Sequence, residues 1–168
     1  MAHADPTASL PQKGTPTIRI ANLHSAKDAN SIVRLLDEYA CDPMGRGMAL
    51  ELAAKERVIA GLAKHPSAIV YLADIDTTVA GLAVCFIQYS TFGAFHLLNI
   101  HDFVVTASVR RRGVGRALLC EICKDAKVRG CQKVTLEVRG DNLAAQRLYR
   151  KEAFGECEPP MLFWQRQL

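Results

Sequence analysis

The 168-residue sequence lacks any apolar run that approaches the roughly 20 residues needed to cross a bilayer. It also has little excess charge, because 21 Lys and Arg against 17 Asp and Glu leave a formal net charge of +4. Bulk charge this mild does not indicate nucleic-acid binding. No internal repeat or low-complexity region is present, and 49% hydrophobic residues are ordinary for a folded globular domain. We therefore expect no membrane partner and no nucleic-acid partner.

The first 16 residues have no continuous apolar core and no early Lys or Arg. We expect residues 1–16 to form a flexible tail rather than a secretory signal, with the folded domain over residues 17–168. Without an export signal, the six cysteines are expected to be reduced thiols in a cytoplasmic protein. Cys120 and Cys123 have C-x-x-C spacing, but a second pair of ligands is missing. We therefore expect small side chains near the buried face of a helix there, and no metal site.

Hydrophobic periodicity and turn residues predict a mixed α/β layout on one sheet. Strands are expected at 17–21, 68–73, 79–89, 97–106, 133–138 and 161–167, the second and third forming a hairpin. Helices are expected from an N-cap at Ser25 to about Ala40, and at about 49–64, 110–129 and 142–151. Asp28 has the spacing of the acidic partner in a capping box with Ser25.

The expected strand at 97–106 is apolar except for Asn99, His101 and Asp102, and polar residues inside a central strand need a reason. Adjacent strand residues point to opposite faces, so His101 and Asp102 are expected on opposite faces unless a bulge intervenes. With regular pairing, His101 shares a face with Asn99, Phe103 and Val105. The alternative is that both have structural roles, His101 as a buried histidine with hydrogen-bond partners and Asp102 as a carboxylate that caps loop amides.

The segment Arg110–Arg116 (RRRGVGR) lies between a predicted strand and a predicted helix. A helix start offers unpaired backbone amides, and glycines let a bulky anion approach them, so this segment could cradle a pyrophosphate. A Walker A loop is excluded because Arg116 follows Gly115, and a Rossmann fingerprint because Leu118 lies three residues after Gly115. The acyl-CoA pattern R/Q-x-x-G-x-G/A matches at Arg110, Gly113 and Gly115. The alternative is an ordinary glycine-containing loop at a basic helix start.

Charge is unevenly distributed along the chain, since residues 107–151 carry a net charge of +8 and the remainder carries −4. This is compatible with a site for an anionic ligand in one part and a site for a cation in the other. A solvated helical face is the simpler interpretation.

Three features occur in order: a strand ending Phe103-Val104-Val105, the segment Arg110–Arg116, and Asn142-x-x-Ala145-x-x-x-Tyr149 before Phe154. Together they resemble the GNAT superfamily of N-acetyltransferases. Ala153 stands where the family usually has Gly, which is a mild departure. The resemblance implies an α/β fold with a single GNAT-like domain, in which helices flank a central mixed, mostly antiparallel sheet.

The resemblance also implies acetyl-CoA as the cosubstrate, held by residues on both sides of the loop. The implied contacts are Phe103, Val104, Val105, Arg110, Arg111, Arg112, Gly113, Val114, Gly115, Arg116, Asn142 and Tyr149. Tyr149 would protonate the leaving thiolate as a general acid, although a core aromatic is the alternative. His101 or Asp102, or a water held nearby, would take the proton of the amine.

The expected reaction is direct attack of a primary amine on bound acetyl-CoA, since no cysteine has a catalytic setting. A non-catalytic acyl-CoA-binding sensor is the alternative function. By resemblance, the loop at 41–47 shapes the site for a small-molecule or peptide amine. Asp37, Glu38 and Asp42 could attract that amine, or could be ordinary loop and helix charges. A homodimer is possible, as in many superfamily members.

Overall fold

The computed structural model describes residues 14–167, so most of the expected tail lies outside the described residues. The chain divides into two compact units, one reaching to Glu137 and one beginning at Val138, and each is described by itself. The expectation of one domain over residues 17–168 stays a prediction.

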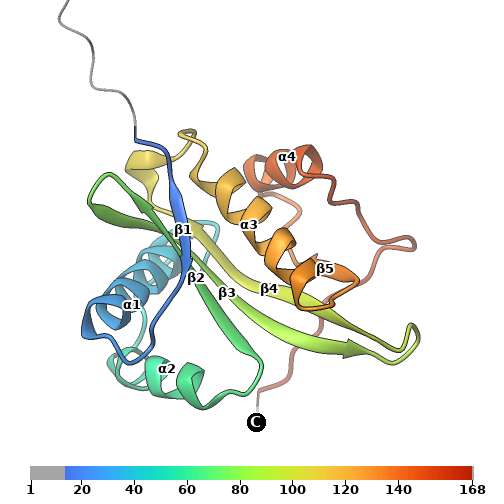
Figure 1. The fold of residues 1–168 in the computed structure, drawn as a ribbon, viewed down its shortest axis with the longest axis horizontal. Coiled ribbons are helices and arrows are strands. Elements are labelled where there is room, and N and C mark those ends of the chain that lie inside the picture. The colour runs from blue at the N-terminus through green and yellow to red at the C-terminus, as the bar shows by residue number, and fades with distance from the viewer. Residues whose placement is uncertain (1–13, 168) are drawn as a thin grey trace, which may run out of the picture. The chain divides into compact units, whose positions relative to one another are not determined.

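The first unit contains a five-stranded sheet in the order β1-β2-β3-β4-β5 (Figure 1). The strands are β1 (Thr17–Ile20), β2 (Ala68–Ile75), β3 (Thr78–Ser90), β4 (Phe95–Val105) and β5 (Lys133–Leu136). Neighbours from β1 to β4 are antiparallel, and β4 pairs with β5 in parallel. The sheet is therefore mixed and mostly antiparallel, as predicted. The predicted hairpin is also confirmed, with β2 and β3 joined at Asp76 and Thr77.

Helices cover both faces of this sheet. On one face, α1 (Ala26–Cys41) and α2 (Leu52–Lys64) pack against the strands. The buried core there comprises Ile32, Leu35, Leu36, Leu62, Val70, Leu72, Val79, Leu82, Val84 and Val104. On the other face lies α3 (Val114–Val128), whose approach at Gly81 is so close that a Cβ there would stand 3.0 Å from Val114 and Leu118. The mixed α/β layout therefore buries both faces of the central strands.

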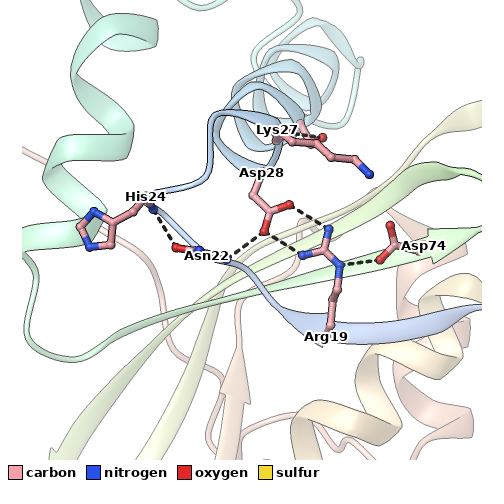
Figure 2. Close-up of polar contacts among 7 residues, drawn as sticks. Arg19, Asn22, His24, Lys27, Asp28 and Asp74 are labelled. Carbon is pink, nitrogen blue, oxygen red and sulfur yellow. Dashed lines mark hydrogen bonds and ion pairs between the residues drawn. The ribbon is translucent and has the colours of Figure 1, made fainter.

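The start of α1 is tied to the sheet by the Arg19 guanidinium (Figure 2). Ser25 is the N-cap, as predicted, but its side chain makes no capping hydrogen bond. Asp28, expected in a capping box, accepts hydrogen bonds from Arg19 at 2.7 and 2.9 Å and from the Asn22 amide at 2.8 Å. Arg19 also donates to Asp74 of β2 at 2.7 Å. One guanidinium thus joins β1, β2 and α1.

Two helices begin later than the sequence predicted. α2 begins at Leu52 because the Leu50 amide donates to Asp37 at 2.8 Å, which holds the preceding segment against α1. α3 begins at Val114, after a short 3₁₀ turn at Ala107–Val109. Its N-cap, Gly113, has φ +85°. Because this left-handed conformation is not helical, the helix cannot include Gly113 or the residues before it.

The second unit contains α4 (Leu143–Lys151), and its N-cap Asn142 accepts a hydrogen bond from the Ala145 amide at 3.1 Å. The strand predicted at 161–167 is wrong, because those residues form no strand. A strand needs a neighbour for its backbone hydrogen bonds, and among residues 14–167 the structure pairs none with this segment. Its apolar side chains are instead exposed, Trp164 by 84%.

Candidate active site

A β-bulge in β4 brings the polar residues of that strand together. Val84 of β3 pairs with Asp102, whereas the next residue, Cys85, pairs with Ile100. His101 is therefore the extra residue of the bulge, and the pairing is not regular. Directly opposed residues share a face, so Asp102 lies on the same face as Val84, beneath α1 and α2.

His101 lies on this face as well. Its ring meets that of Phe86 edge-on, with the centroids 5.6 Å apart, and Phe86 packs against the core under α1 and α2. His101 and Asp102 were expected on opposite faces unless a bulge intervened. The bulge does intervene, and it brings Asp102 to the face of His101. The shared face with Phe103 and Val105 was expected for regular pairing, and the bulge breaks that regularity. Phe103 and Val105 pair with Ala83 and Gly81 on the α3 face.

The bulge also changes the acid–base character of Asp102. The side chain is half-buried, and removal from water raises the pKa of its carboxyl above the usual range, while neighbouring His101 opposes that rise. His101 itself is exposed. A carboxylate with a raised pKa is a stronger proton acceptor, and an exposed imidazole beside it can exchange protons with solvent.

β4 continues past the end of its pairing with β5. The parallel pairing joins Leu97–Ile100 to Lys133–Leu136, while β4 itself runs on to Val105. The parallel register with β5 therefore ends at Ile100, directly before the bulge. Beyond Ile100, Val104 is buried opposite Leu82.

A further carboxylate, Glu137, directly follows the last residue of β5, and it was not among the site residues expected from the sequence. The buried Asn99 side chain donates to Thr135 at 3.2 Å and approaches both oxygens of Glu137 at 3.4 and 3.5 Å. Asn99 shares its face with Phe86 through pairing, and Thr135 pairs with Asn99 in parallel. The signal that could have found Glu137 is strand alternation, because it lies two residues beyond Thr135. Asn99, His101, Asp102 and Glu137 thus form a polar set on one face.

The glycine-containing loop has the backbone geometry of an anion cradle. Arg111 has φ +64° and Gly113 has φ +85°, so the chain turns sharply before Val114 opens α3. No atom lies within 4 Å of the position that a Cβ would take at Gly113. Amides in the first turn of a helix have no intrahelical acceptor, and the helix dipole favours negative charge there. The pyrophosphate of a coenzyme A ester fits a site of this kind.

The arginines of this loop divide into two groups. Arg110 donates to Asp42 at 2.7 Å and to the Val105 carbonyl at 3.0 Å, and Arg112 donates to Asp76 at 3.3 Å. Arg111 and Arg116 are exposed. Of the four expected phosphate contacts, Arg110 and Arg112 therefore contact the protein's own acids through their side chains.

The acids expected near the acceptor have positively charged partners of their own. Asp37 is 2.7 Å from Lys55, and that hydrogen bond lowers the pKa of Asp37. Glu38 accepts from the Thr106 hydroxyl at 3.0 Å and the Ala107 amide at 3.2 Å. Asp42 pairs with Arg110, as described above. These contacts fit the structural alternative, in which the acids hold α1, α2 and the glycine-containing loop together.

Two expected site residues lie in the second unit. Asn142 caps α4 through its side-chain oxygen. Tyr149, in the last turns of that helix, is buried, and its ring centroid is 6.0 Å from that of Phe154. The contact fits the core-aromatic alternative and leaves the acid role a prediction.

The cysteines form neither a disulfide nor a metal site in the described structure. All six lie within residues 14–167, and none of them is joined in a disulfide. Cys120 is exposed, whereas the sequence predicted it on or near a buried helix face. Over the same range, no group of three or more His, Cys, Asp or Glu side chains is arranged to hold a metal ion. No helix formed by these residues is long and apolar enough to cross a membrane.

A comparison of the chain with known protein families agrees with this fold. Residues 32–155 match the acetyltransferase (GNAT) family, which is well over half of the chain. The chain therefore belongs to the GNAT family of acetyltransferases.

Individual relatives are more distant. An acetyltransferase of Sodalis glossinidius (strain morsitans) is 34% identical over 74 residues, which are 44% of this chain and 49% of that protein. The match thus spans about half the length of this curated relative.

Two solved structures show the fold. The ribosomal-protein-alanine N-acetyltransferase of Brucella melitensis biovar Abortus 2308 has a TM-score of 0.71 at 18% identity, over 91% of this chain and 100% of that chain. An aminoglycoside acetyltransferase from an uncultured soil metagenomic sample, solved with sisomicin, has a TM-score of 0.75 at 14% identity, over 91% of this chain and 97% of that chain. At such identities the likeness concerns the fold alone.

Proposed function

We propose that this protein is an N-acetyltransferase that transfers the acetyl group of acetyl-CoA directly to a primary amine. The observation that carries the proposal is that β4 continues beyond its last pair with β5, at Ile100, and leads along the chain into the Gly113 loop and the N-terminus of α3. An opened strand edge can pair with an amide-containing arm, and the helix start can hold the pyrophosphate attached to that arm. Membership of the GNAT family supports the same assignment.

The cosubstrate would be held mainly by backbone groups. The backbone of Phe103–Val105 would bind the pantetheine arm, and the amides of Arg111–Arg116 would bind the pyrophosphate, with exposed Arg111 and Arg116 adding attraction. The family resemblance adds Asn142 beside the pantetheine. The thioester supplies an activated acyl group, and the residues of this chain orient and polarise it.

In the proposed step, the acceptor nitrogen attacks the thioester carbonyl carbon. The C–N bond forms, the C–S bond breaks, and Tyr149 gives its proton to the departing sulfur. The proton that the nitrogen loses on becoming an amide restores the Tyr149 hydroxyl, directly or through water. The amine must first be neutral, so its ammonium proton passes to His101, Asp102 or Glu137, or to a water that they hold. The raised pKa of the Asp102 carboxyl, which is half-buried beside exposed His101, supports this part of the surface as the proton acceptor.

The acceptor class follows from the same polar set. Asp102 and Glu137 can attract a cationic amine, in place of the acids around α1 that already have charged partners. The two structural neighbours described above are named for their acceptors, a ribosomal-protein alanine and an aminoglycoside. A small-molecule or peptide amine is therefore the proposed acceptor.

The decisive experiment measures acetyl-CoA binding and acetyl-CoA consumption in the same preparation. We expect a thermal shift with acetyl-CoA and release of free thiol that depends on an added primary amine. Binding without turnover for any amine in a broad screen supports a non-catalytic acyl-CoA sensor. The absence of any thermal shift contradicts the assignment of the loop itself.

A further inference from the structure

Three aromatic rings lie in a row on the face of the sheet that carries the polar set. Phe86 of β3 is the middle ring, with His65 on one side at 4.8 Å between centroids and His101 on the other at 5.6 Å. Both contacts are edge-on, with interplanar angles of 64° and 75°. We call these three side chains the aromatic row.

The row is assembled from three separate parts of the chain. His65 is the C-cap of α2, where its Nδ1 faces the Ser67 amide and hydroxyl, each at 3.4 Å. His101 lies two residues after Asn99, which pairs with Phe86, so strand alternation places it on the face of the row. The two histidine side chains are exposed, and Phe86 is half-buried between them.

This composition differs from the rest of the face. The neighbouring inward positions are aliphatic, for example Leu72, Leu82 and Val84, and they are fully buried beneath the helices. An aliphatic side chain at position 86 could pack against the edge of the core equally well. Packing alone therefore does not explain a partly exposed aromatic ring there. Exposed aromatic rings next to carboxylates are typical of sites that bind a ligand with an apolar body and a charged end.

The row also lies next to the chemistry proposed above. Phe86 is paired with Asn99, whose amide approaches Glu137, and His101 adjoins Asp102. A ligand whose ammonium meets these carboxylates would therefore place its body against the rings. Ring stacking and cation–π contact both favour that arrangement.

We infer that the aromatic row selects the acceptor, and that the acceptor is a primary amine carrying a flat, apolar group a few bonds from its nitrogen. This inference rests on the proposed acetyl transfer and specifies its substrate class. Polar amines without such a group can reach the carboxylates but gain nothing from the row.

The test compares 2-phenylethylamine with ethanolamine as acceptors at saturating acetyl-CoA. We expect a higher kcat/KM for 2-phenylethylamine in the wild-type enzyme. In Phe86→Leu, which keeps the position apolar, KM for 2-phenylethylamine should rise about threefold to tenfold, the scale of one aromatic contact. KM for ethanolamine and the Kd of acetyl-CoA should not change.

His96→Ala is the matched control. His96 is also an exposed histidine on β4 with an edge-on ring contact, to Tyr89 at 5.4 Å. Its register with Tyr89 places it on the α3 face, away from the aromatic row. This variant should retain the wild-type values for both amines.

Calorimetric titration of 2-phenylethylamine into the protein with CoA bound separates the two proposals. Binding that is lost in Phe86→Leu, without any acetylation, would support the row and contradict the proposed acetyl transfer. Acetylation of both amines with equal kcat/KM, or equal losses for both in Phe86→Leu, would overturn the row and leave acetyl transfer intact.

Discussion

The carboxylate of Asp42 and the guanidinium of Arg110 are 2.7 Å apart, and they connect the loop after α1 to the glycine-containing loop before α3. Nε of Arg110 also donates to the Val105 carbonyl at the end of β4. The Arg110 side chain therefore connects three segments: the loop after α1, the end of β4 and the glycine-containing loop. Arg110 acts here as a structural link, whereas the sequence pattern alone presents it as a phosphate contact.

Neutralising Asp42 should weaken this link slightly and in a pH-dependent way. Hydrogen bonds from Arg110 and from the Met44 amide hold the pKa of Asp42 below its usual range. Its stabilisation is therefore present above the unfolded pKa of about 3.9 and is lost as pH falls through the lower folded pKa. Because Arg110 is half exposed, Asp42→Asn should cost no more than about 1 kcal/mol at pH 7. Urea unfolding across pH should show the difference shrinking below about pH 4; a constant difference would contradict the ion-pair explanation.

Breaking the contact between Arg19 and Asp28 should cost more, because Asp28 is buried. Arg19→Met leaves a buried carboxylate without its main donor, and we expect a loss of about 1.5–3 kcal/mol in the free energy of unfolding. Lys27→Met is the matched control, since Lys27 is an exposed neighbour on α1, and it should change stability by less than about 0.5 kcal/mol. Equal effects of the two variants would show that general charge, rather than the contact, stabilises α1.

Gly115→Glu should abolish the thermal shift produced by acetyl-CoA. It introduces a side chain and a negative charge at the N-terminus of α3, where the pyrophosphate is expected. At a free concentration about 100 times the Kd, wild-type binding should add roughly 2.7 kcal/mol of stability. Val128→Glu places the same charge at the exposed opposite end of α3, and it should keep the shift.

Tyr149→Phe tests the proton donor. The substitution keeps the ring that contacts Phe154 and removes only the hydroxyl. We expect kcat to fall by about 10²-fold or more, with an unchanged Kd for acetyl-CoA, because the proton matters in the transition state. Tyr89→Phe removes a hydroxyl from an exposed ring and should leave kcat unchanged. An unchanged kcat in Tyr149→Phe, with the chemical step limiting the rate, would return Tyr149 to a packing role.

The pH dependence of kcat/KM identifies the proton acceptor. Burial raises the pKa of the Asp102 carboxyl, so a limb in kcat/KM that reports Asp102 lies at higher pH than that of an ordinary aspartate. Profiles should therefore be compared for His101→Ala, Asp102→Asn and Glu137→Gln. The variant that erases the lower limb and slows the reaction by about 10²-fold or more identifies the base. Retention of the limb in all three would mean that the free-amine fraction of the substrate sets it.

Local pattern was enough to predict most of the fold. Alternation and turn residues place the strands to within a few residues, and the glycine spacing identifies the loop at the start of α3. These features depend on interactions between residues close in the chain, so they can be predicted from the sequence alone. The prediction of a strand at 161–167 was wrong because an apolar pattern does not specify which strand would pair with it.

The arrangement of the polar residues depended on the tertiary structure. A bulge arises from the register between β3 and β4, and it brings Asp102 to the face on which His101 contacts Phe86. Glu137 reaches Asn99 because β5 pairs in parallel with β4, which a sequence pattern does not define. Pair register is decided by packing across the whole sheet. The sequence alone therefore determined which chemical groups are available, and only the folded sheet determined which of them meet.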